Sequence, residues 1–176
     1  MIKESSMSAY AFMAVILFVI LFSSFLALTM SYQRVYKLKN EALNIIEKYN
    51  GYTPTAKGIM DTYFQTQNYT NKGSCYHSNT DFEPDASAAW YGVNYGENPV
   101  LADNSAQYNY CIRRVTIYPE ATASDPTAGQ PKVYYRIMFF HIINMPVLNI
   151  LGAFRVNGTT NTLFDQSPNN MWQQHP

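Results

Sequence analysis

Hydrophobic and polar positions divide the chain into two unlike stretches. Residues 11–30 contain no charged side chain, and twelve of these twenty residues are Val, Ile, Leu or Phe. The whole apolar run, residues 9–30, is 22 residues long. At about 1.5 Å of rise per residue, a helix of that length crosses the ~30 Å hydrocarbon core of a bilayer. The run therefore predicts a membrane-embedded helix. Its length disfavours a buried helix of a soluble protein, and the missing A-x-A pattern disfavours a cleaved signal peptide.

The predicted helix continues far beyond the apolar run. Gly51 and Pro54 are the first glycine and the first proline of the chain, which indicates one unbroken helix over residues 1–50. Hydrophobic residues in its second half recur at alternating spacings of three and four: Val35, Leu38, Ala42, Ile45 and Tyr49. Such a stripe is buried either against the chain's own C-terminal region or against helices of neighbouring subunits. Asn50-Gly51 is expected to end the helix, with Gly51 in the left-handed conformation.

Residues 51–176 are predicted to form a β-rich domain. All eight glycines and all nine prolines lie there. A second, short helix is expected within residues 52–67, and residues 68–109 have the composition of loops. Four segments have the alternation or the β-branched and aromatic content of strands: 110–118, 132–143, 152–156 and 159–164. The second of these has apolar residues on both faces and suits a central strand, and Asn157-Gly158 predicts a two-residue hairpin between the last two. The fold class is thus α+β, with one long N-terminal helix followed by a small antiparallel sheet.

The two cysteines of the chain, Cys75 and Cys111, both follow the apolar run. In an oxidising compartment they are expected to form one disulfide, which closes a loop of about 36 residues and stabilises the fold by roughly 4 kcal/mol in the chain-entropy model. Two unpaired buried thiols are the alternative. Zinc is disfavoured because neither cysteine has a second ligand at close spacing.

The orientation signals disagree with each other. Arg34, Lys37 and Lys39 follow the apolar run, whereas Lys3 alone precedes it. Counted literally, these charges would place the C-terminal domain in the cytoplasm. The cysteine pair and the Tyr-, Asn- and Thr-rich surface favour the opposite side, and a basic leader removed before Met1 would reconcile the two. We expect an extracytoplasmic domain.

Motifs for catalysis, metal binding or nucleic-acid binding are missing from the sequence. The formal net charge is zero, which gives no electrostatic footprint for nucleic acid. His77, His141 and His175 are isolated in sequence, and no G-x-S-x-G or Gly-rich phosphate loop is present. The alternating acidic residues in DFEPD lack the calcium-loop pattern and are expected to be solvated. We therefore expect no enzyme, no cofactor and no metal. Four clustered tyrosines suit either a contact surface or core packing: Tyr91, Tyr95, Tyr108 and Tyr110.

The pattern as a whole resembles a known family. A polar start with Glu4, a continuous apolar-then-amphipathic helix and a C-terminal sheet resemble a type IV pilin-like subunit. The segment MPVLNILGAFRVNGTTNTL looks like the end of the TadE-like pseudopilins. The resemblance implies that a leader is cut before the apolar run, and that a glutamate at the fifth mature position compensates a neighbour's N-terminal amine; Glu4 lies one place earlier if Met1 is the mature start. The residues that we expect to carry assembly are Glu4, Leu17, Ile20, Phe22, Leu38, Ala42 and Ile45.

The expected function is that of a structural subunit of a type IV pilus-like or tight-adherence filament. Such a subunit waits in the membrane as a single-pass protein and then polymerises through its apolar helix into a cell-surface filament. Its expected partners are identical or homologous pilin subunits, the membrane before assembly, and the inner-membrane assembly machinery. The alternative is a non-polymerising single-pass component of a secretion or conjugation apparatus, and a membrane-tethered enzyme ranks third.

Overall fold

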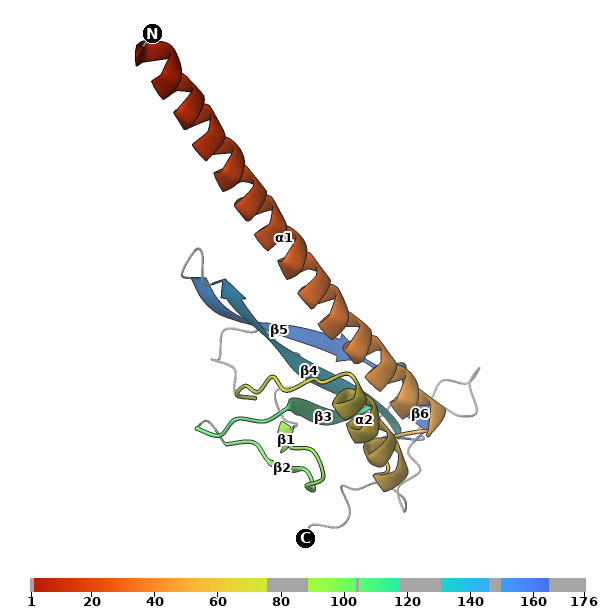
Figure 1. Ribbon diagram of the computed structural model, residues 1–176. Helices are drawn as coiled ribbons and strands as arrows, with labels where there is room; N and C mark the ends of the chain where they lie inside the picture. Colours follow the sequence, from red (N-terminus) through yellow and green to blue (C-terminus); the bar gives the residue numbers. More distant parts are fainter. Residues whose placement is uncertain (1, 76–88, 104, 118–130, 146–149, 165–176) are drawn as a thin grey trace.

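The computed structural model describes residues 2–75, 89–103, 105–117, 131–145 and 150–164 (Figure 1). They form a long helix, a short helix and one antiparallel sheet, so the predicted α+β class is confirmed. The elements are α1 (Ile2–Lys48), α2 (Pro54–Thr66), β1 (Tyr91–Val93), β2 (Val100–Leu101), β3 (Tyr110–Ile117), β4 (Lys132–Met145), β5 (Ile150–Thr159) and β6 (Leu163–Phe164).

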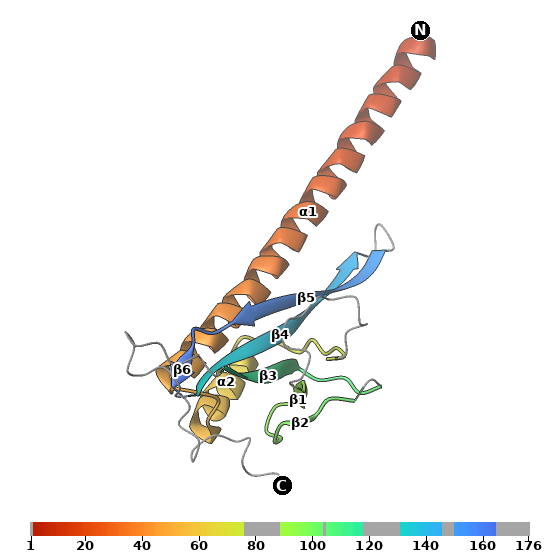
Figure 2. The same ribbon diagram turned by 180° about the vertical axis from the view of Figure 1, so that it is seen from behind.

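The predicted unbroken helix is confirmed as α1, which is 47 residues long. Its C-terminal half lies along the sheet, and its N-terminal half extends away from the rest of the molecule (Figures 1 and 2). The helix ends where expected, but the residue that adopts the left-handed conformation differs from the predicted one. Asn50 has φ of 50° and takes the left-handed conformation, whereas Gly51 has φ of 137°. Asparagine tolerates this conformation because its side chain is short and polar, and the Gly51 N–H then donates to the Ile46 carbonyl oxygen at 2.9 Å.

The second helix, α2, confirms the prediction for residues 52–67. Thr53 caps its N-terminus, because the Thr53 hydroxyl accepts a hydrogen bond from the Ala56 N–H at 3.1 Å. Pro54 occupies the first helical position, where a missing N–H costs nothing. Asn68, with φ of 51°, ends the helix in the way that Asn50 ends α1.

The sheet has the strand order β2-β1-β3-β4-β5, and β6 pairs with the beginning of β4. Every described pairing is antiparallel. The strands predicted at 110–118 and 132–143 are confirmed as β3 and β4. The expectation of loops throughout 68–109 is wrong, because β1 and β2 lie within it. These strands have three and two residues, which is too short for an alternating pattern to stand out.

Both faces of β4 are covered, as its composition predicts. On one face Ile137 and Phe139 pack with Leu38 of α1 and Phe64 of α2 in the main hydrophobic core. On the other face Met138 and Phe140 pack in a smaller cluster with the two cysteines. The sheet is therefore a middle layer, with the helices on one side.

The predicted hairpin turn at Asn157-Gly158 is wrong. Both residues lie within β5, and they pair with Met138 and Ile137 of β4. The glycine serves another purpose there: a Cβ atom on Gly158 would lie 2.8 Å from Lys39 Cδ and 2.9 Å from Leu43 Cδ1 of α1. Gly158 thus permits a close approach of helix and sheet, and the chain turns only after Thr159.

Candidate functional site

The most unusual surface of the protein is the N-terminal half of α1. No residue from 9 to 34 is buried, and none of the most apolar stretch of the helix is covered by the described part of the domain. Large hydrophobic side chains are exposed all round it, including Phe12, Leu17 and Phe25 at 61 to 68 % exposure. By length and composition α1 is able to cross a membrane, and it fits a single-pass membrane protein.

The serine and threonine side chains of residues 11–30 are satisfied within the helix. The Ser24 hydroxyl donates to the Ile20 carbonyl oxygen at 2.8 Å, and the Thr29 hydroxyl donates to the Leu26 carbonyl oxygen at 2.8 Å. Ser23 donates in the same way to the Val19 carbonyl oxygen. Hydroxyls bonded back to the preceding turn expose little hydrogen-bonding capacity. The helix surface over residues 11–30 therefore behaves as apolar on every side.

The structure separates the residues expected to carry assembly into two groups. Leu17, Ile20 and Phe22 are exposed on the protruding half at 61, 40 and 54 %. The second group lies in the chain's own hydrophobic core: Leu38, Ala42 and Ile45. Of the two partners considered for the heptad stripe, the chain's own domain is therefore the one that covers it here. Glu4 lies within α1, and its side chain lies outside the described part.

Aromatic residues stand at both ends of the apolar run, a feature that the sequence analysis missed. Tyr10 is 78 % exposed near one end, and Tyr32 and Tyr36 are each 47 % exposed beyond the other. Tyrosine is enriched where a helix passes from hydrocarbon to water, because its ring is apolar and its hydroxyl is polar. The spacing of these tyrosines around the run was the available signal. Arg34 follows at the same level and donates to the Gln67 carbonyl oxygen.

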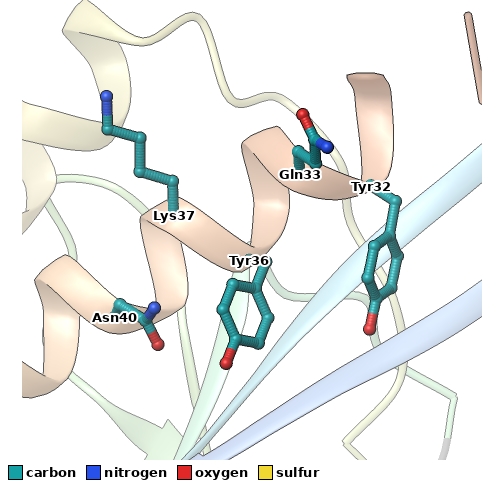
Figure 3. A pocket seen from close by; sticks show the side chains of 5 residues that line it. All are labelled: Tyr32, Gln33, Tyr36, Lys37 and Asn40. Atoms are coloured by element: carbon teal, nitrogen blue, oxygen red, sulfur yellow. The ribbon is translucent and has the colours of Figure 1, made fainter. Parts of the chain in front are cut away.

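Two shallow hollows lie on the helices. One, of about 340 Å³, is lined by residues of α1 alone: Tyr32, Gln33, Tyr36, Lys37 and Asn40 (Figure 3). The other, of about 580 Å³, is lined by α2 residues alone, from Thr55 to Thr66. Figure 3 shows the two tyrosine rings on one side of α1 and Lys37 pointing to another. Because each hollow is a gap between side chains of a single helix, neither brings polar groups together from several directions as a substrate site does.

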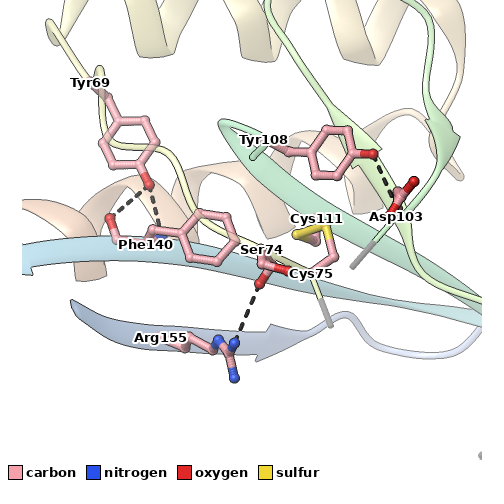
Figure 4. The surroundings of a disulfide bond; sticks show 8 residues. All are labelled: Tyr69, Ser74, Cys75, Asp103, Tyr108, Cys111, Phe140 and Arg155. Atoms are coloured by element: carbon pink, nitrogen blue, oxygen red, sulfur yellow. Dashed lines mark hydrogen bonds between the residues drawn. A yellow bond between two sulfur atoms is a disulfide. The ribbon is translucent and has the colours of Figure 1, made fainter. Parts of the chain in front are cut away.

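The predicted disulfide is confirmed between Cys75 and Cys111, whose Cα atoms lie 5.6 Å apart (Figure 4). Both cysteines are fully buried beside Phe140 on the sheet face opposite the helices. A backbone bridge between Gly73 and Tyr108 lies nearby. The disulfide therefore ties the segment after α2 to the centre of the sheet.

The clustered tyrosines form core and not an exposed contact surface. Tyr110 and Tyr108 are buried at 0 and 5 % exposure, and Tyr91 and Tyr95 pack against the core. The Tyr110 hydroxyl lies 2.8 Å from the Tyr52 hydroxyl and donates to Asp61 Oδ1 at 3.4 Å. Burial raises the pKa of Tyr110 well above its ordinary value of 10.0. This network satisfies polar groups in the interior.

Asp61 links that interior network to the helix that carries it. It forms an ion pair with Lys57 one turn earlier on α2, and both side chains are buried. The Gly96 N–H donates to Asp61 Oδ2 at 3.2 Å. The carboxylate therefore has a cation, a hydroxyl and a backbone N–H around it, and a buried charge with this many partners is structurally satisfied.

Groups for catalysis do not converge in the described part of the chain. Within it, no three His, Cys, Asp or Glu side chains come together as metal ligands. His141 is 3 % exposed, and burial lowers its pKa below the ordinary 6.5. Its ring lies 6.3 Å from that of Tyr32, centroid to centroid, so it belongs to the junction between α1 and the sheet. His77, His175 and the acidic residues of DFEPD lie outside the described residues.

Comparison with known proteins adds no relative to this picture. No protein-family model, curated protein or solved structure matches the chain.

Proposed function

We propose that this protein is a structural subunit of a type IV pilus-like or tight-adherence surface filament. The observation that carries the proposal is the rod formed by α1, whose apolar half is exposed on all sides and continues without a break into a half packed on the sheet. Apolar surface of this extent requires a covering in water. Lipid covers it before assembly, and the same halves of neighbouring copies cover it in a filament.

The positions of the expected assembly residues assign different roles to the two halves of α1. Leu17, Ile20 and Phe22 are free to contact other copies, so we assign them to polymerisation. Leu38, Ala42 and Ile45 are used within the chain, so they hold the domain on the helix. Glu4 retains its proposed role of meeting a neighbour's N-terminal amine, because a carboxylate among packed apolar helices needs an opposite charge.

The disulfide supports an extracytoplasmic position for the domain. Disulfides form and persist in oxidising compartments and are rare in the cytosol. A single-pass subunit with this orientation presents its sheet domain outside and its apolar helix to the membrane. It would then meet identical or homologous subunits and the inner-membrane assembly machinery there.

A fixed membrane anchor is the second candidate function. The observation that favours it is the fit of the apolar run to one bilayer, with Tyr10 at one end and Tyr32 at the other. In that case the protein would be a non-polymerising single-pass component of a secretion or conjugation apparatus. The helix would then never leave the lipid.

Glu4→Ala, made in the cell that produces the protein, separates the two candidates. Filament yield should collapse if Glu4 draws an incoming subunit to its place, whereas a fixed anchor should show no change. Glu97→Ala is the matched control, because Glu97 is an exposed glutamate of the sheet domain. Isolated surface filaments with this polypeptide as repeating unit would support the proposal, and a stable monomer confined to membranes would overturn it.

A cross-linking experiment tests the contact itself. The two cysteines of the chain form the disulfide, so Leu17→Cys introduces a single free thiol. We expect it to cross-link copies in isolated filaments. Leu101→Cys is the control, because Leu101 is 64 % exposed and Leu17 is 61 % exposed. Cross-linking of the two variants to the same extent would argue against packing through α1. The N-terminal residue and its methylation state would report on leader processing.

A further inference from the structure

The hairpin of β4 and β5 extends past the ring pair of Tyr32 and His141, where α1 meets the sheet. From His141, β4 continues for four residues to Met145, and β5 returns from Ile150 to Phe154, which pairs with His141. At about 3.4 Å per residue this is ~14 Å of hairpin. We call the strand residues 142–145 and 150–154 the hairpin arm.

The hairpin arm extends from the sheet on the same side as the apolar half of α1. Figures 1 and 2 show that it rises beside the helix and diverges from it at an angle. Tyr32 stands just beyond the apolar run, at the level where a membrane-spanning α1 passes from lipid to water. The arm begins at this level, since His141 lies against Tyr32, and it extends in the direction of the membrane.

The arm has the composition of a lipid-contacting segment. The nine residues of the arm contain no charged side chain, and Asn144 is their only strongly polar member. The two described side chains of the arm with large apolar surface are Ile142, at 43 % exposure, and Phe154, at 55 %. They lie on opposite faces, because Phe154 pairs with His141 and Ile142 is the next residue. A protein partner would cover one face of the arm, whereas lipid surrounds both faces, so apolar surface on both faces favours contact with lipid.

Backbone hydrogen bonding limits how deep the arm sits. In the described part of the chain, β3 pairs with β4 only as far as Phe139, and β5 is the last strand of the sheet order. The Tyr69 hydroxyl satisfies the backbone N–H and carbonyl of Phe140 at 2.8 Å each. Among the described residues no strand pairs with the outer edge of β4 beyond Phe140, and such an edge needs water or lipid headgroups, because open edges do not occur in hydrocarbon. This places the arm at the boundary of headgroups and acyl chains, the depth that amphipathic segments occupy.

We propose that the hairpin arm is a second membrane contact, which inserts Ile142 and Phe154 into the headgroup–acyl boundary of the leaflet that α1 leaves. The partner is a phospholipid surface. The inference rests on the membrane-inserted state of the proposed function, and it adds a specific orientation: with the helix and the arm both in lipid, the domain cannot rotate freely about α1.

The test uses the full chain in phosphatidylcholine vesicles with nitroxides on the acyl chains. Phe154→Cys carries an environment-sensitive fluorophore, and Leu101→Cys, on the far edge strand of the sheet, is the matched control. We expect severalfold stronger quenching at position 154 than at 101, by nitroxides near the headgroup. Ile142→Cys is a second probe on the opposite face of the arm, and it should behave as 154 does. Equal quenching at 142, 154 and 101 would overturn the proposal.

Two further arms of the experiment separate the possible failures. Phe22→Cys reports on α1: strong quenching by deep nitroxides shows a spanning helix, and its absence means that the membrane state of the proposed function has failed. Quenching at 22 without quenching at 154 overturns the hairpin proposal alone. Diluting the protein to less than one chain per vesicle tests whether a second copy of the chain, and not lipid, covers the arm. If the label at 154 loses its apolar environment on dilution, a second copy covers the arm and the lipid assignment is wrong.

Discussion

The two halves of α1 contain similar hydrophobic residues but have opposite surroundings. Leu17 is 61 % exposed in the N-terminal half, whereas Leu38 is 1 % exposed in the C-terminal half. The first half is apolar on every side, and the second is apolar on one stripe that the sheet covers. A helix thus exposes its hydrophobic residues when they encircle it and no domain is near, and it buries them when they form one face.

The same substitution in the two halves should have unequal effects on stability. Leu38→Ala removes a buried side chain and leaves a cavity, so we expect the free energy of unfolding of the domain to fall by about 2–5 kcal/mol. Leu17→Ala should change it by less than about 0.5 kcal/mol, because Leu17 contacts no part of the domain. Denaturant unfolding in detergent, followed by near-UV circular dichroism, measures both. Similar losses for both variants would break the comparison.

Removing the disulfide should weaken the layer that covers the packed half and leave the apolar half unchanged. Cys75→Ser with Cys111→Ser should lower the free energy of unfolding by roughly 4 kcal/mol, because the unfolded chain regains the freedom of the closed loop. Membrane insertion of α1 should persist. The two readouts are denaturant unfolding and extraction of the protein from membranes by alkaline carbonate. Loss of insertion together with stability would mean that the halves are coupled.

Two glycines sharpen the comparison, because they should respond to alanine with opposite signs. Gly158 lies against Lys39 and Leu43 of α1, so a methyl group there should cost about 1 kcal/mol by crowding the contact of helix and sheet. Gly58 lies on the exposed side of α2, and its Cβ would meet nothing within 4 Å. Gly58→Ala should therefore stabilise by about 1 kcal/mol through helix propensity. Calorimetric melting temperatures should fall for the first variant and rise for the second.

The smallest expected effect is a pH dependence at the junction of the two halves. Burial lowers the pKa of His141 in the folded state below the ordinary 6.5. As the pH falls through 6.5, the unfolded chain binds a proton at His141 before the folded chain does. The free energy of unfolding therefore decreases toward acid pH, and the contribution of neutral His141 to stability is complete only above pH 6.5. Urea midpoints measured at about pH 7.5 and about pH 5.5 should show this slope. His141→Phe should reduce it, and an unchanged slope would assign it to other groups.

Local signals in the sequence predicted both helices and the two longest strands, and a long-range contact accounts for the error at the predicted hairpin. The absence of Gly and Pro before Gly51 predicted α1, and the capping pattern at Thr53 and Pro54 fits α2, because helices depend on neighbouring residues. The hairpin at Asn157-Gly158 was predicted from a local turn pattern. It was wrong because Gly158 meets α1, more than a hundred residues earlier in the chain, and no local pattern reports such a contact.

The exposed apolar surface of α1 was predictable in part, because local patterns are readable in the sequence and long-range contacts are not. Leu17, Ile20 and Phe22 were selected from an uncharged run, and they are exposed, since an all-round apolar helix offers no stripe to a domain. The heptad stripe was ambiguous between the chain's own domain and a neighbouring copy. Spacing alone indicates that a face is buried but does not identify what covers it. The burial of Tyr108 and Tyr110 was equally open, because tyrosine suits cores and surfaces alike.

The sequence by itself determined a long helix that is able to span a membrane and a following antiparallel domain, and it left the two cysteines as either a disulfide or two buried thiols. The helix and the domain follow from local backbone preference and hydrophobic length. The tertiary structure alone decided that the stripe from Val35 to Ile45 packs on β4 and β5, that Gly158 admits the helix, and that the hairpin arm extends past Tyr32. These depend on which distant surfaces meet, and that is settled by the packing of the whole chain.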